Sequence, residues 1–382
     1  MTSNPTVFLD HQASTPVSQA VLEAMLPYFS GGYANPHSED HSAGWAASQA
    51  IEAAREQVAC AVGAEPSEIV FTSGATESNN LALLGAAAAD GERGAIVVSA
   101  IEHKSVLAIG RALQRAGREL RVVPVDESGL LNIDALAAAI YGDVTIVSIG
   151  AVNNEIGVVQ DMAAVADLCR SRGALLHSDV TQGVGWSAVD VETMGVDLAS
   201  FSAHKLRGPK GIGALFVSLA ATDRIAPVMH GGGQERGLRP GTLPTPLCVG
   251  FGAACTLLPN KADVESWRLV TRHLLNGVEQ LFPNLILNGA GDPRHPGNLN
   301  FRVPGIDAQL LVARAQPHVA LSRGAACTSG IPEQSHVLRA IGLSEEEADA
   351  SIRLSTGLDT TFSEIDAAIV ELAKAAYLPE SL

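Results

Sequence analysis

The chain has 382 residues, of which 47% are hydrophobic and 17% charged, and its formal net charge is −16. This composition allows a large core and excludes a disordered chain, and the length allows two domains. The acidic balance argues against direct binding of nucleic acid, which needs a basic surface. No apolar run reaches 18 residues and the N-terminus lacks a signal-peptide pattern, so we expect a cytoplasmic protein without membrane spans.

The N-terminal part is expected to begin with a short strand over residues 7–9. Apolar residues at helical spacing predict helices from about 18 to 29 and from 45 to 62. The stretch 31–37 between them contains two glycines and a proline and is expected to be a loop.

From residue 68 onward, apolar runs that predict strands alternate with segments of helical period. The predicted strands are 68–72, 94–99, 120–124, 144–150, 174–179, 197–202 and 212–217, and the predicted helices are 77–89, 104–116, 132–140 and 161–172. This alternation predicts an α/β fold with a mostly parallel seven-stranded sheet covered on both faces. The pattern leaves open whether the strand at 212–217 is an antiparallel edge.

The C-terminal third predicts a smaller α+β unit. Helices near 243–258 and 263–281 are followed by strands near 297–303, 318–321 and 351–355 and helices near 307–315, 334–341 and 362–377. Asn260 and the charged residues after it suggest a domain boundary. We therefore expect a large domain over 15–259 and a small domain that combines 1–14 with 260–382.

The stretch from Thr72 to Asn79 follows one predicted strand and opens a helix. Such a turn directs free N–H groups and the positive end of the helix dipole at one place, which favours an anion site. The alternative is an ordinary helix cap at Ser73 or Thr76.

Lys205 and Asp179 each stand where an apolar strand ends. Ligands of α/β sheets bind at the carboxyl ends of the strands. A lysine whose pKa is lowered by burial can attack a carbonyl group, and a buried aspartate needs a cationic partner. The alternatives are a surface lysine at the start of a loop and a helix-capping aspartate.

Polar residues also follow other predicted strands. His103 and Asn154 end two of them, although each is also compatible with a structural role or a turn. Arg353 lies inside a strand pattern, where it could hold a carboxylate with two hydrogen bonds or stand on an edge strand. The Gly-rich, charged segment 231–242 could surround a ligand or a neighbouring subunit, or be a surface loop.

The five cysteines include no C-x-x-C pair, so neither a disulfide framework nor a zinc site is expected. Small residues surround Cys327, from Ser322 to Gly330, which predicts an uncrowded, mobile loop and makes Cys327 the candidate for a reactive thiol. The other four cysteines lie in apolar helical context and are expected in the core.

Seven stretches together, in order, resemble one family closely. They read TSGATESNN, IEHKSV, NNEIGVVQD, HSDVTQ, SFSAHKLRGPKGIG, ERGLRPGT and ACTSG. From about Phe8 to Gly357 the chain resembles a cysteine desulfurase of the NifS/IscS type, within the class V aminotransferase-like, fold-type I enzymes that use pyridoxal 5'-phosphate. In its short C-terminal tail and its overall sequence the chain also resembles the desulfurases of the bacterial DNA phosphorothioation system.

The resemblance implies a role for each matching residue. Lys205 would bind the cofactor covalently, Asp179 would pair with its pyridinium nitrogen, and Gln182 would hydrogen-bond its phenolic oxygen. His103 would stack on the ring and move protons. The residues implied to hold the cofactor phosphate are Ala75, Thr76, Ser202 and His204, with Thr242 from the other subunit of a homodimer. Those implied to hold the substrate carboxylate are Asn35, Asn154 and Arg353.

The implied reaction converts L-cysteine to L-alanine. Lys205 would remove the Cα proton, and the Cys327 thiolate would attack the substrate sulfur and keep it as a persulfide for an acceptor protein. Iron–sulfur cluster assembly, thiolation or DNA phosphorothioation would then use the sulfur. One residue departs from the family pattern: Arg323 would lower the pKa of Cys327 or bind its loop down.

Two other readings fit parts of the pattern. A selenocysteine lyase or a class V aminotransferase would keep Lys205 and Asp179, and an aminotransferase would not need Cys327. A non-catalytic sulfur-relay subunit would keep the fold and bind no cofactor.

Overall fold

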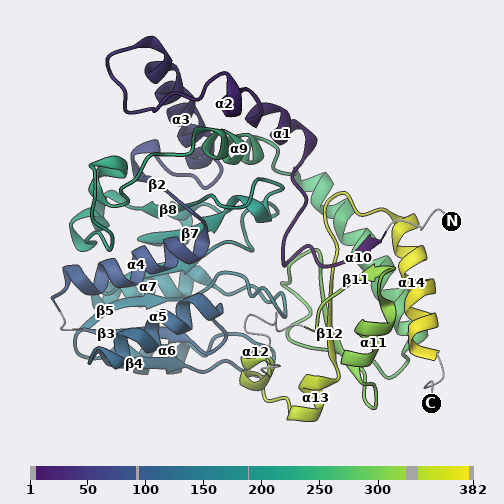
Figure 1. Cartoon of the computed structure of the whole chain (residues 1–382). Helices are drawn as coiled ribbons and strands as arrows, with labels where there is room; N and C mark the ends of the chain where they lie inside the picture. The colour runs from purple at the N-terminus through teal and green to yellow at the C-terminus, as the bar shows by residue number, and fades with distance from the viewer. Residues whose placement is uncertain (1–5, 92–93, 188, 324–333, 378–382) are drawn as a thin grey trace.

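A seven-stranded sheet forms the centre of the larger part of the molecule (Figure 1). The computed structural model describes residues 6–91, 94–187, 189–323 and 334–377. The strands, in their order across the sheet, are β2 (Ile69–Thr72), β8 (Gly213–Val217), β7 (Leu198–Ser202), β6 (Leu175–Asp179), β5 (Val144–Ser148), β3 (Ala95–Ser99) and β4 (Leu120–Val123). All seven lie where the sequence predicts strands, and the predicted α/β class is confirmed.

β8 settles the orientation that the sequence left open. It is antiparallel to both of its neighbours, β7 and β2, whereas every other pair in this sheet is parallel. It is not an edge strand, because β2 lies outside it. The connection between β7 and β8 is only ten residues and contains no crossover helix beyond one short turn, and so short a connection favours an antiparallel neighbour.

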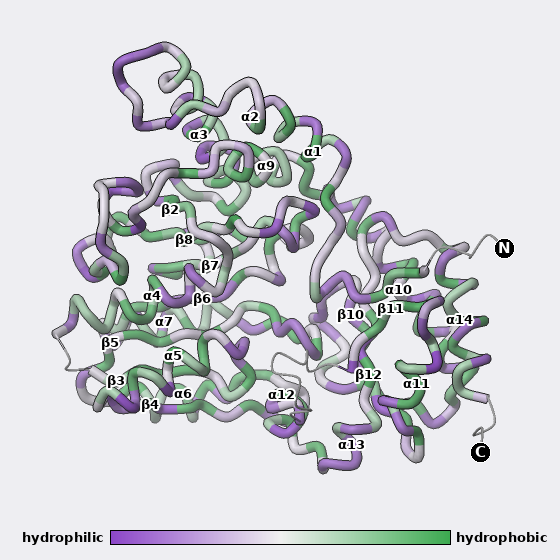
Figure 2. The backbone as a smooth tube through the Cα atoms, in the orientation of Figure 1, coloured by the Kyte–Doolittle hydropathy of each residue, from purple (hydrophilic) through white to green (hydrophobic). Residues whose placement is uncertain are grey.

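Helices cover both faces of this sheet, as predicted. Alternate residues of one strand serve opposite faces: in β3, Val97 packs on one side and Ile96 and Val98 on the other. The first face is covered by α1 (Gln19–Met25), α3 (Ser42–Cys60), α6 (Ile133–Ala139), α7 (Met162–Arg172) and α9 (Thr245–Thr256). The second is covered by α4 (Ala75–Ala89) and α5 (Lys104–Arg115). Figure 2 shows the hydrophobic strands between these layers.

Local chemistry sets several helix ends differently from the hydrophobic pattern. The helix predicted over 18–29 is interrupted, because Pro27 begins a second helix, α2 (Pro27–Ser30). α10 (Lys261–Leu281) begins two residues earlier than predicted, because Asn260 and Asp263 form a reciprocal capping box. A short helix that the sequence did not predict, α8 (Val191–Met194), is capped by the side chain of Asp190.

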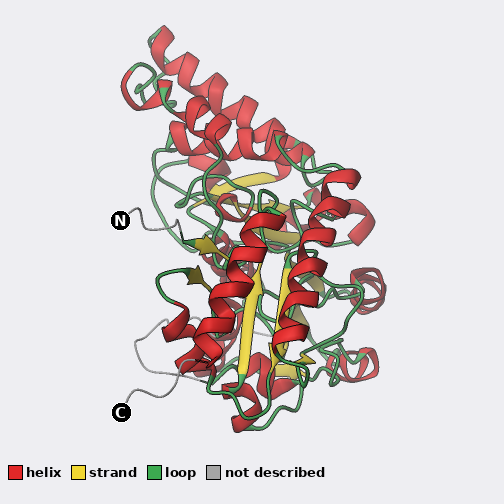
Figure 3. Ribbon diagram, turned by 90° about the vertical axis from the view of Figure 1, so that its right-hand side faces the viewer, coloured by secondary structure: helices red, strands yellow, loops and turns green. Residues whose placement is uncertain are grey.

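A second core lies beside the large sheet. It is built on the antiparallel strands β9 (Ile286–Leu287), β10 (Asn298–Arg302) and β12 (Ser351–Ser355), and on a parallel pair, β1 (Val7–Phe8) and β11 (Val319–Ala320). Helices α10, α11 (Ala308–Ala315) and α14 (Phe362–Tyr377) pack on these strands, in front of the smaller sheet in Figure 3. The boundary near residue 260 stays a prediction.

The remaining elements are short. They are the helices α12 (His336–Ala340) and α13 (Glu345–Asp349) and the 3₁₀ turns η1 (Pro66–Glu68), η2 (Ala203–Lys205), η3 (Leu219–Arg224) and η4 (Gln234–Gly237). None of the helices in the described part of the chain is both long enough and apolar enough to cross a membrane.

Candidate active site

A cavity of about 580 Å³ opens at the carboxyl ends of the parallel strands. Its volume lies within the range of about 300–1,000 Å³ that is usual for small-molecule sites. The sequence predicted this location, because strand ends of a parallel sheet meet at one edge. Ten predicted site residues line it: Ala75, Thr76, His103, Asn154, Asp179, Gln182, Ser202, His204, Lys205 and Arg353.

Lys205 ends the short turn η2 that follows β7, and its amine points to backbone oxygens of the N-terminal segment. Nζ donates hydrogen bonds to the carbonyls of Gln12 and Ala13, the latter at 2.9 Å. Burial, reinforced by the positive charge of Arg353, lowers the pKa of Lys205 to about 8. Near neutral pH a useful fraction of this lysine is therefore an uncharged, nucleophilic amine.

Asp179, the last residue of β6, is held as an acceptor by two donors. Asn79 Nδ2 donates to Oδ2 at 2.9 Å, and the backbone N–H of Thr181 donates to Oδ1 at 3.0 Å. These bonds fix the carboxylate at the cavity wall, as a partner for a protonated ring nitrogen requires. The sequence analysis quoted Asn79 within its motif but gave it no role.

His103 caps the first turn of α5 with its own ring. The Nδ1 atom accepts the backbone N–H of Ser105 at 3.2 Å and lies 2.7 Å from Ser105 Oγ. Burial, together with the positive charges of Lys205 and Lys104, lowers the pKa of His103. The imidazole is thus kept neutral beside the cavity.

The predicted anion cradle lies at the beginning of α4. Gly74 precedes the helix with φ of 146°, a conformation that strongly favours glycine, and no side chain caps the first turn. Ala75 and Thr76 of this turn line the cavity together with Ser202 and His204, and the first N–H groups of a helix lack acceptors within the helix, as an anion site requires. Burial and the charges of Lys205 and Lys210 lower the pKa of His204 to about 4, so it meets an anion as a neutral donor.

Arg353 is buried in β12 and lines the same cavity. It forms an ion pair with Asp10 at 2.7 Å and donates to the backbone carbonyl of Asn154 at 2.9 Å. Its Nε finds no hydrogen-bond partner within the described residues. The guanidinium group lines the cavity, and a substrate carboxylate is the kind of group that such a donor binds.

Gln182 and Ser355 hold Gln12 of the N-terminal segment in place. Gln182 Nε2 donates to the carbonyl of Gln12 at 3.0 Å, and the backbone N–H of Gln12 donates to Ser355 Oγ at 3.0 Å. Gln12 and Asp10 are therefore site residues that the sequence analysis missed. Their only signal was a polar run directly after the strand at 7–9.

Two buried glutamates also line the cavity and were not predicted. Glu102 accepts the backbone N–H of Gly150 at 2.8 Å, but burial and the nearby Asp179 raise its pKa to about 8. Burial raises the pKa of Glu155 to about 7. The pKa values of both carboxyl groups thus lie at or above neutral pH, which limits the negative charge of the cavity wall.

Three predicted residues are not brought to this cavity by the described chain. Asn35 and Thr242 are exposed and do not line it. Cys327 lies outside the described residues. Arg323, just before that segment, donates to Gln309 of α11 at 3.2 Å.

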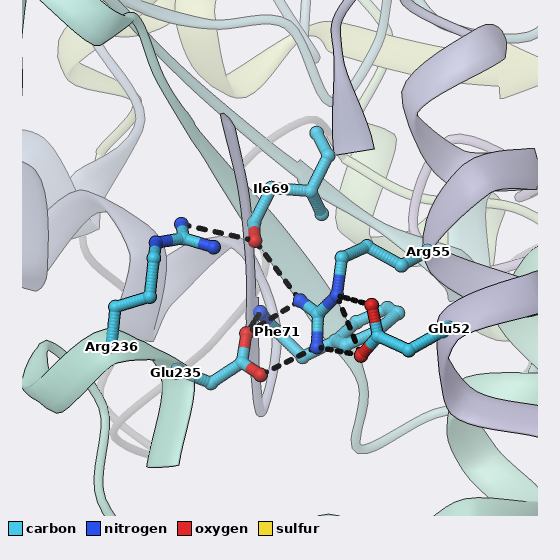
Figure 4. A network of polar contacts seen from close by, with 6 residues as sticks. All are labelled: Glu52, Arg55, Ile69, Phe71, Glu235 and Arg236. Atoms are coloured by element: carbon cyan, nitrogen blue, oxygen red, sulfur yellow. Dashed lines mark hydrogen bonds and ion pairs between the residues drawn. The ribbon is translucent and has the colours of Figure 1, made fainter. Parts of the chain in front are cut away.

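The segment 231–242 is anchored rather than free. Figure 4 shows the buried Glu235 carboxylate between Arg55 of α3 and the backbone N–H of Phe71 in β2, at distances of 2.7, 2.8 and 2.6 Å. Further along, Arg239 pairs with Glu77 of α4 at 2.8 Å, and Glu77 accepts the N–H of Ser73. The segment that carries Thr242 is thereby tied to the strand and helix on either side of the anion cradle.

The described cysteines differ from the expectation at one position. Cys169, Cys248 and Cys255 are buried, and burial raises the pKa of each thiol. Cys60, which we expected in the core, is exposed, because it is the last residue of α3 and faces away from the core. Three of the four described thiols are therefore poor nucleophiles at neutral pH.

The residues present fit pyridoxal 5'-phosphate. A lysine of lowered pKa, a fixed carboxylate and an uncapped helix start with a glycine supply the amine, the ring partner and the anion cradle that this cofactor needs. All three lie on one cavity large enough for it.

Comparison with known proteins agrees with this geometry. The aminotransferase class-V family model matches residues 7–368, and the chain belongs to this family. Cysteine desulfurase IscS of Rickettsia akari (strain Hartford) is 44% identical over 366 residues, which cover 95% of this chain and 89% of the relative.

Solved structures lead to the same group. A NifS-like protein superimposes with a TM-score of 0.89 at 32% identity, covering 97% of this chain and 98% of its own. DndA from Streptomyces lividans superimposes with a TM-score of 0.74 at 38% identity, covering 90% and 97%. The resemblance to cysteine desulfurases of the NifS/IscS type is confirmed, and the chain is a pyridoxal-phosphate-dependent enzyme of this type.

Proposed function

We propose that this enzyme converts L-cysteine to L-alanine with the residues of the cavity described above and passes the sulfur through Cys327 to an acceptor protein. The observation that carries the proposal is the amine of Lys205, whose pKa is lowered to about 8 in a cavity shared with Asp179. When bound, the cofactor supplies an electron sink that stabilises negative charge at the substrate Cα.

Lys205 would hold the cofactor, and its free amine would act as the base at the substrate Cα. The carbonyl oxygens of Gln12 and Ala13 fix the position of this amine by accepting its hydrogen bonds. Asp179, fixed by Asn79 and Thr181, would keep a proton on the ring nitrogen. Arg353 and Asn154 would orient the substrate carboxylate, and their place in the cavity wall supports this role.

The sulfur step is a nucleophilic displacement at the substrate sulfur. The Cys327 thiolate attacks the substrate sulfur, the bond between that sulfur and the substrate carbon breaks, and its electron pair stays with the carbon. The carbon takes up a proton and leaves as alanine, while Cys327 keeps the sulfur as a persulfide. One L-cysteine and one Cys327 thiol thus give one L-alanine and one persulfide.

The test compares Cys327→Ser with Cys60→Ser, the matched control at an exposed thiol. We expect all three purified proteins to be yellow, and only Cys327→Ser to lose alanine and sulfide formation from L-cysteine under reductant. Equal activity of Cys327→Ser and wild type would favour an aminotransferase-type reaction. Protein that stays colourless with added cofactor would favour the non-catalytic relay subunit.

We further propose a cytoplasmic homodimer in which Thr242 reaches the cofactor phosphate of the partner subunit. The anchored segment 231–242 and the exposure of Thr242 outside its own cavity support this arrangement. Sedimentation equilibrium should give twice the chain mass, and Thr242→Ala should weaken cofactor binding.

For the fate of the sulfur we propose iron–sulfur cluster assembly. The 44% identity over 95% of this chain to a relative named IscS supports this choice among the outlets that the resemblance implies. Transfer of ³⁵S from the loaded enzyme to a cluster scaffold protein tests it.

A further inference from the structure

We infer that Asn79 and Ser105 are positioning residues that hold His103 in a single neutral tautomer, with Nδ1 as an acceptor and the hydrogen on Nε2. The tautomer itself follows from hydrogen bonds within the chain. Its consequence for the reaction rests on the proposed function, which places a substrate in the cavity that His103 lines.

The first constraint comes from the helix that His103 caps. The N–H groups in the first turn of a helix have no acceptor within the helix. In α5 the N–H of Ser105 is directed at His103 Nδ1, at 3.2 Å. A hydrogen on Nδ1 would point at this N–H and leave it without an acceptor, so Nδ1 carries the lone pair.

The second constraint begins at Asp179. A carboxylate accepts hydrogen bonds, so the atom of Asn79 that lies 2.9 Å from Asp179 Oδ2 is its amino nitrogen. The same amino group has a second hydrogen, which is directed at Ser105 Oγ at 2.9 Å. The Ser105 oxygen therefore accepts from Asn79, and its own hydrogen is free to point to His103 Nδ1 at 2.7 Å.

Both observations agree with one tautomer. With Nδ1 as acceptor, the backbone N–H and the hydroxyl of Ser105 can both donate to it, while the hydroxyl oxygen accepts from the Asn79 amide that Asp179 orients. The lowered pKa of His103 agrees with a neutral ring. The resting enzyme then offers an N–H, not a lone pair, at His103 Nε2.

This arrangement determines how His103 can contact a group bound in the cavity. A neutral ring that gave up its Nε2 proton would become an imidazolate anion, so with Nδ1 occupied by the donors of Ser105 the ring keeps this proton and donates a hydrogen bond from Nε2–H. In this tautomer His103 would orient the substrate-derived group as a hydrogen-bond donor and would not be the base that ionises the incoming thiol. That role does not follow from the presence of a histidine at this position.

The experiment is ¹⁵N NMR of histidine-labelled protein, first without cofactor, with the His103 signal assigned by its loss in His103→Gln. We expect wild-type His103 to show a hydrogen on Nε2 and none on Nδ1 from pH 7 to 9. His41 provides an internal reference, because its Nδ1 caps α3 with one donor, Gly44 N–H at 3.0 Å, and no hydroxyl. A hydrogen on Nδ1 of His103, or an even mixture, would overturn the inference.

Variants test the two named residues. In Ser105→Ala we expect the second tautomer to appear and kcat to fall about tenfold with little change in KM, and Ser105→Thr, which keeps a hydroxyl, should restore both. In Asn79→Ala the second tautomer should appear to a smaller extent. A wild-type tautomer in both Ser105→Ala and Asn79→Ala, with folding confirmed by circular dichroism, would contradict their role. The NMR result in cofactor-free protein is independent of activity, so it can hold even if the proposed reaction fails.

Discussion

Arg55 and Lys205 are cationic side chains whose surroundings are opposite. Arg55 donates to both oxygens of Glu235 at 2.8 and 2.7 Å and also pairs with Glu52 at 3.1 Å. Lys205 has only carbonyl oxygens as hydrogen-bond partners among the described residues. Burial opposes the charge of both side chains, yet the carboxylates outweigh it for Arg55 and raise its pKa, whereas the pKa of Lys205 falls to about 8.

The difference separates a structural cation from a reactive one. A buried charge with a bidentate carboxylate partner is fixed in its protonation state and holds chain segments together. In a buried amine without such a partner, desolvation lowers the pKa. More of the amine is then neutral and nucleophilic. The following predictions test this contrast, from the largest expected effect to the smallest.

Replacing Lys205 should remove activity without weakening the fold. In Lys205→Met we expect desulfurase activity to fall by about 10³-fold or more, because the nucleophile and base are lost. The free energy of unfolding of the cofactor-free protein should stay the same or rise, because a poorly solvated charge disappears. Alanine formation and denaturant unfolding measure the two effects, and a clearly less stable variant would contradict the contrast.

Replacing Arg55 should do the reverse. Arg55→Met leaves the Glu235 carboxylate buried without its cation and should lower the free energy of unfolding by about 3–5 kcal/mol. The double variant Arg55→Met/Glu235→Gln, which removes both charges, should recover part of this loss. Urea unfolding of the cofactor-free proteins checks both, and a loss below about 1 kcal/mol in the single variant would show that the pair is not structural.

The pH dependence of cofactor capture should report the pKa of Lys205. Only the neutral amine reacts, and below the pKa its fraction rises about tenfold per pH unit. With the pKa lowered from 10.5 to about 8, the rate should climb from pH 6.5 and level off above about pH 8.5. Stopped-flow absorbance of cofactor-free protein mixed with cofactor measures it, with N-acetyl-lysine as the ordinary amine. A rate that still rises at pH 10 would show that Lys205 has the pKa of an ordinary lysine.

An exposed ion pair should have the smallest effect on the free energy of unfolding. Asp167 and Arg170 of α7 lie 2.9 Å apart, but their side chains are 80% and 66% exposed. Asp167→Asn should change the free energy of unfolding by less than about 0.5 kcal/mol, because solvent screens such pairs. A loss similar to that of Arg55→Met would mean that burial is not what distinguishes Arg55.

The sequence was sufficient for the large sheet and for the strand ends that carry chemistry. Asp179, Lys205 and His103 each follow an apolar run, and parallel strands bring such positions to one edge without knowledge of any other contact. The break in the first predicted helix could also have been predicted from Pro27, because proline begins a helix far more easily than it continues one.

The rest of the site depends on contacts between distant segments. Asp10 pairs with Arg353 across 343 positions of the chain, and no local pattern encodes that pair. The bonds from Asn79 to Asp179 and Ser105 depend on which face of α4 meets the sheet and on the packing of α5 beside it. Cys60 was misplaced for the same reason, since an apolar helix context does not say which face of the final turn is covered.

The hydrogen bonds from Lys205 to the carbonyls of Gln12 and Ala13 have a consequence for the folding of the chain during synthesis. The segment that carries Gln12 and Ala13 is held by residues near the other end of the chain, through the pairing of β1 with β11 and the bond from Gln12 to Ser355. A ribosome must therefore release residue 355 before this segment can take its place beside Lys205. A nascent chain that has completed the large sheet but has not yet released residue 355 would still lack this part of the environment of its reactive lysine.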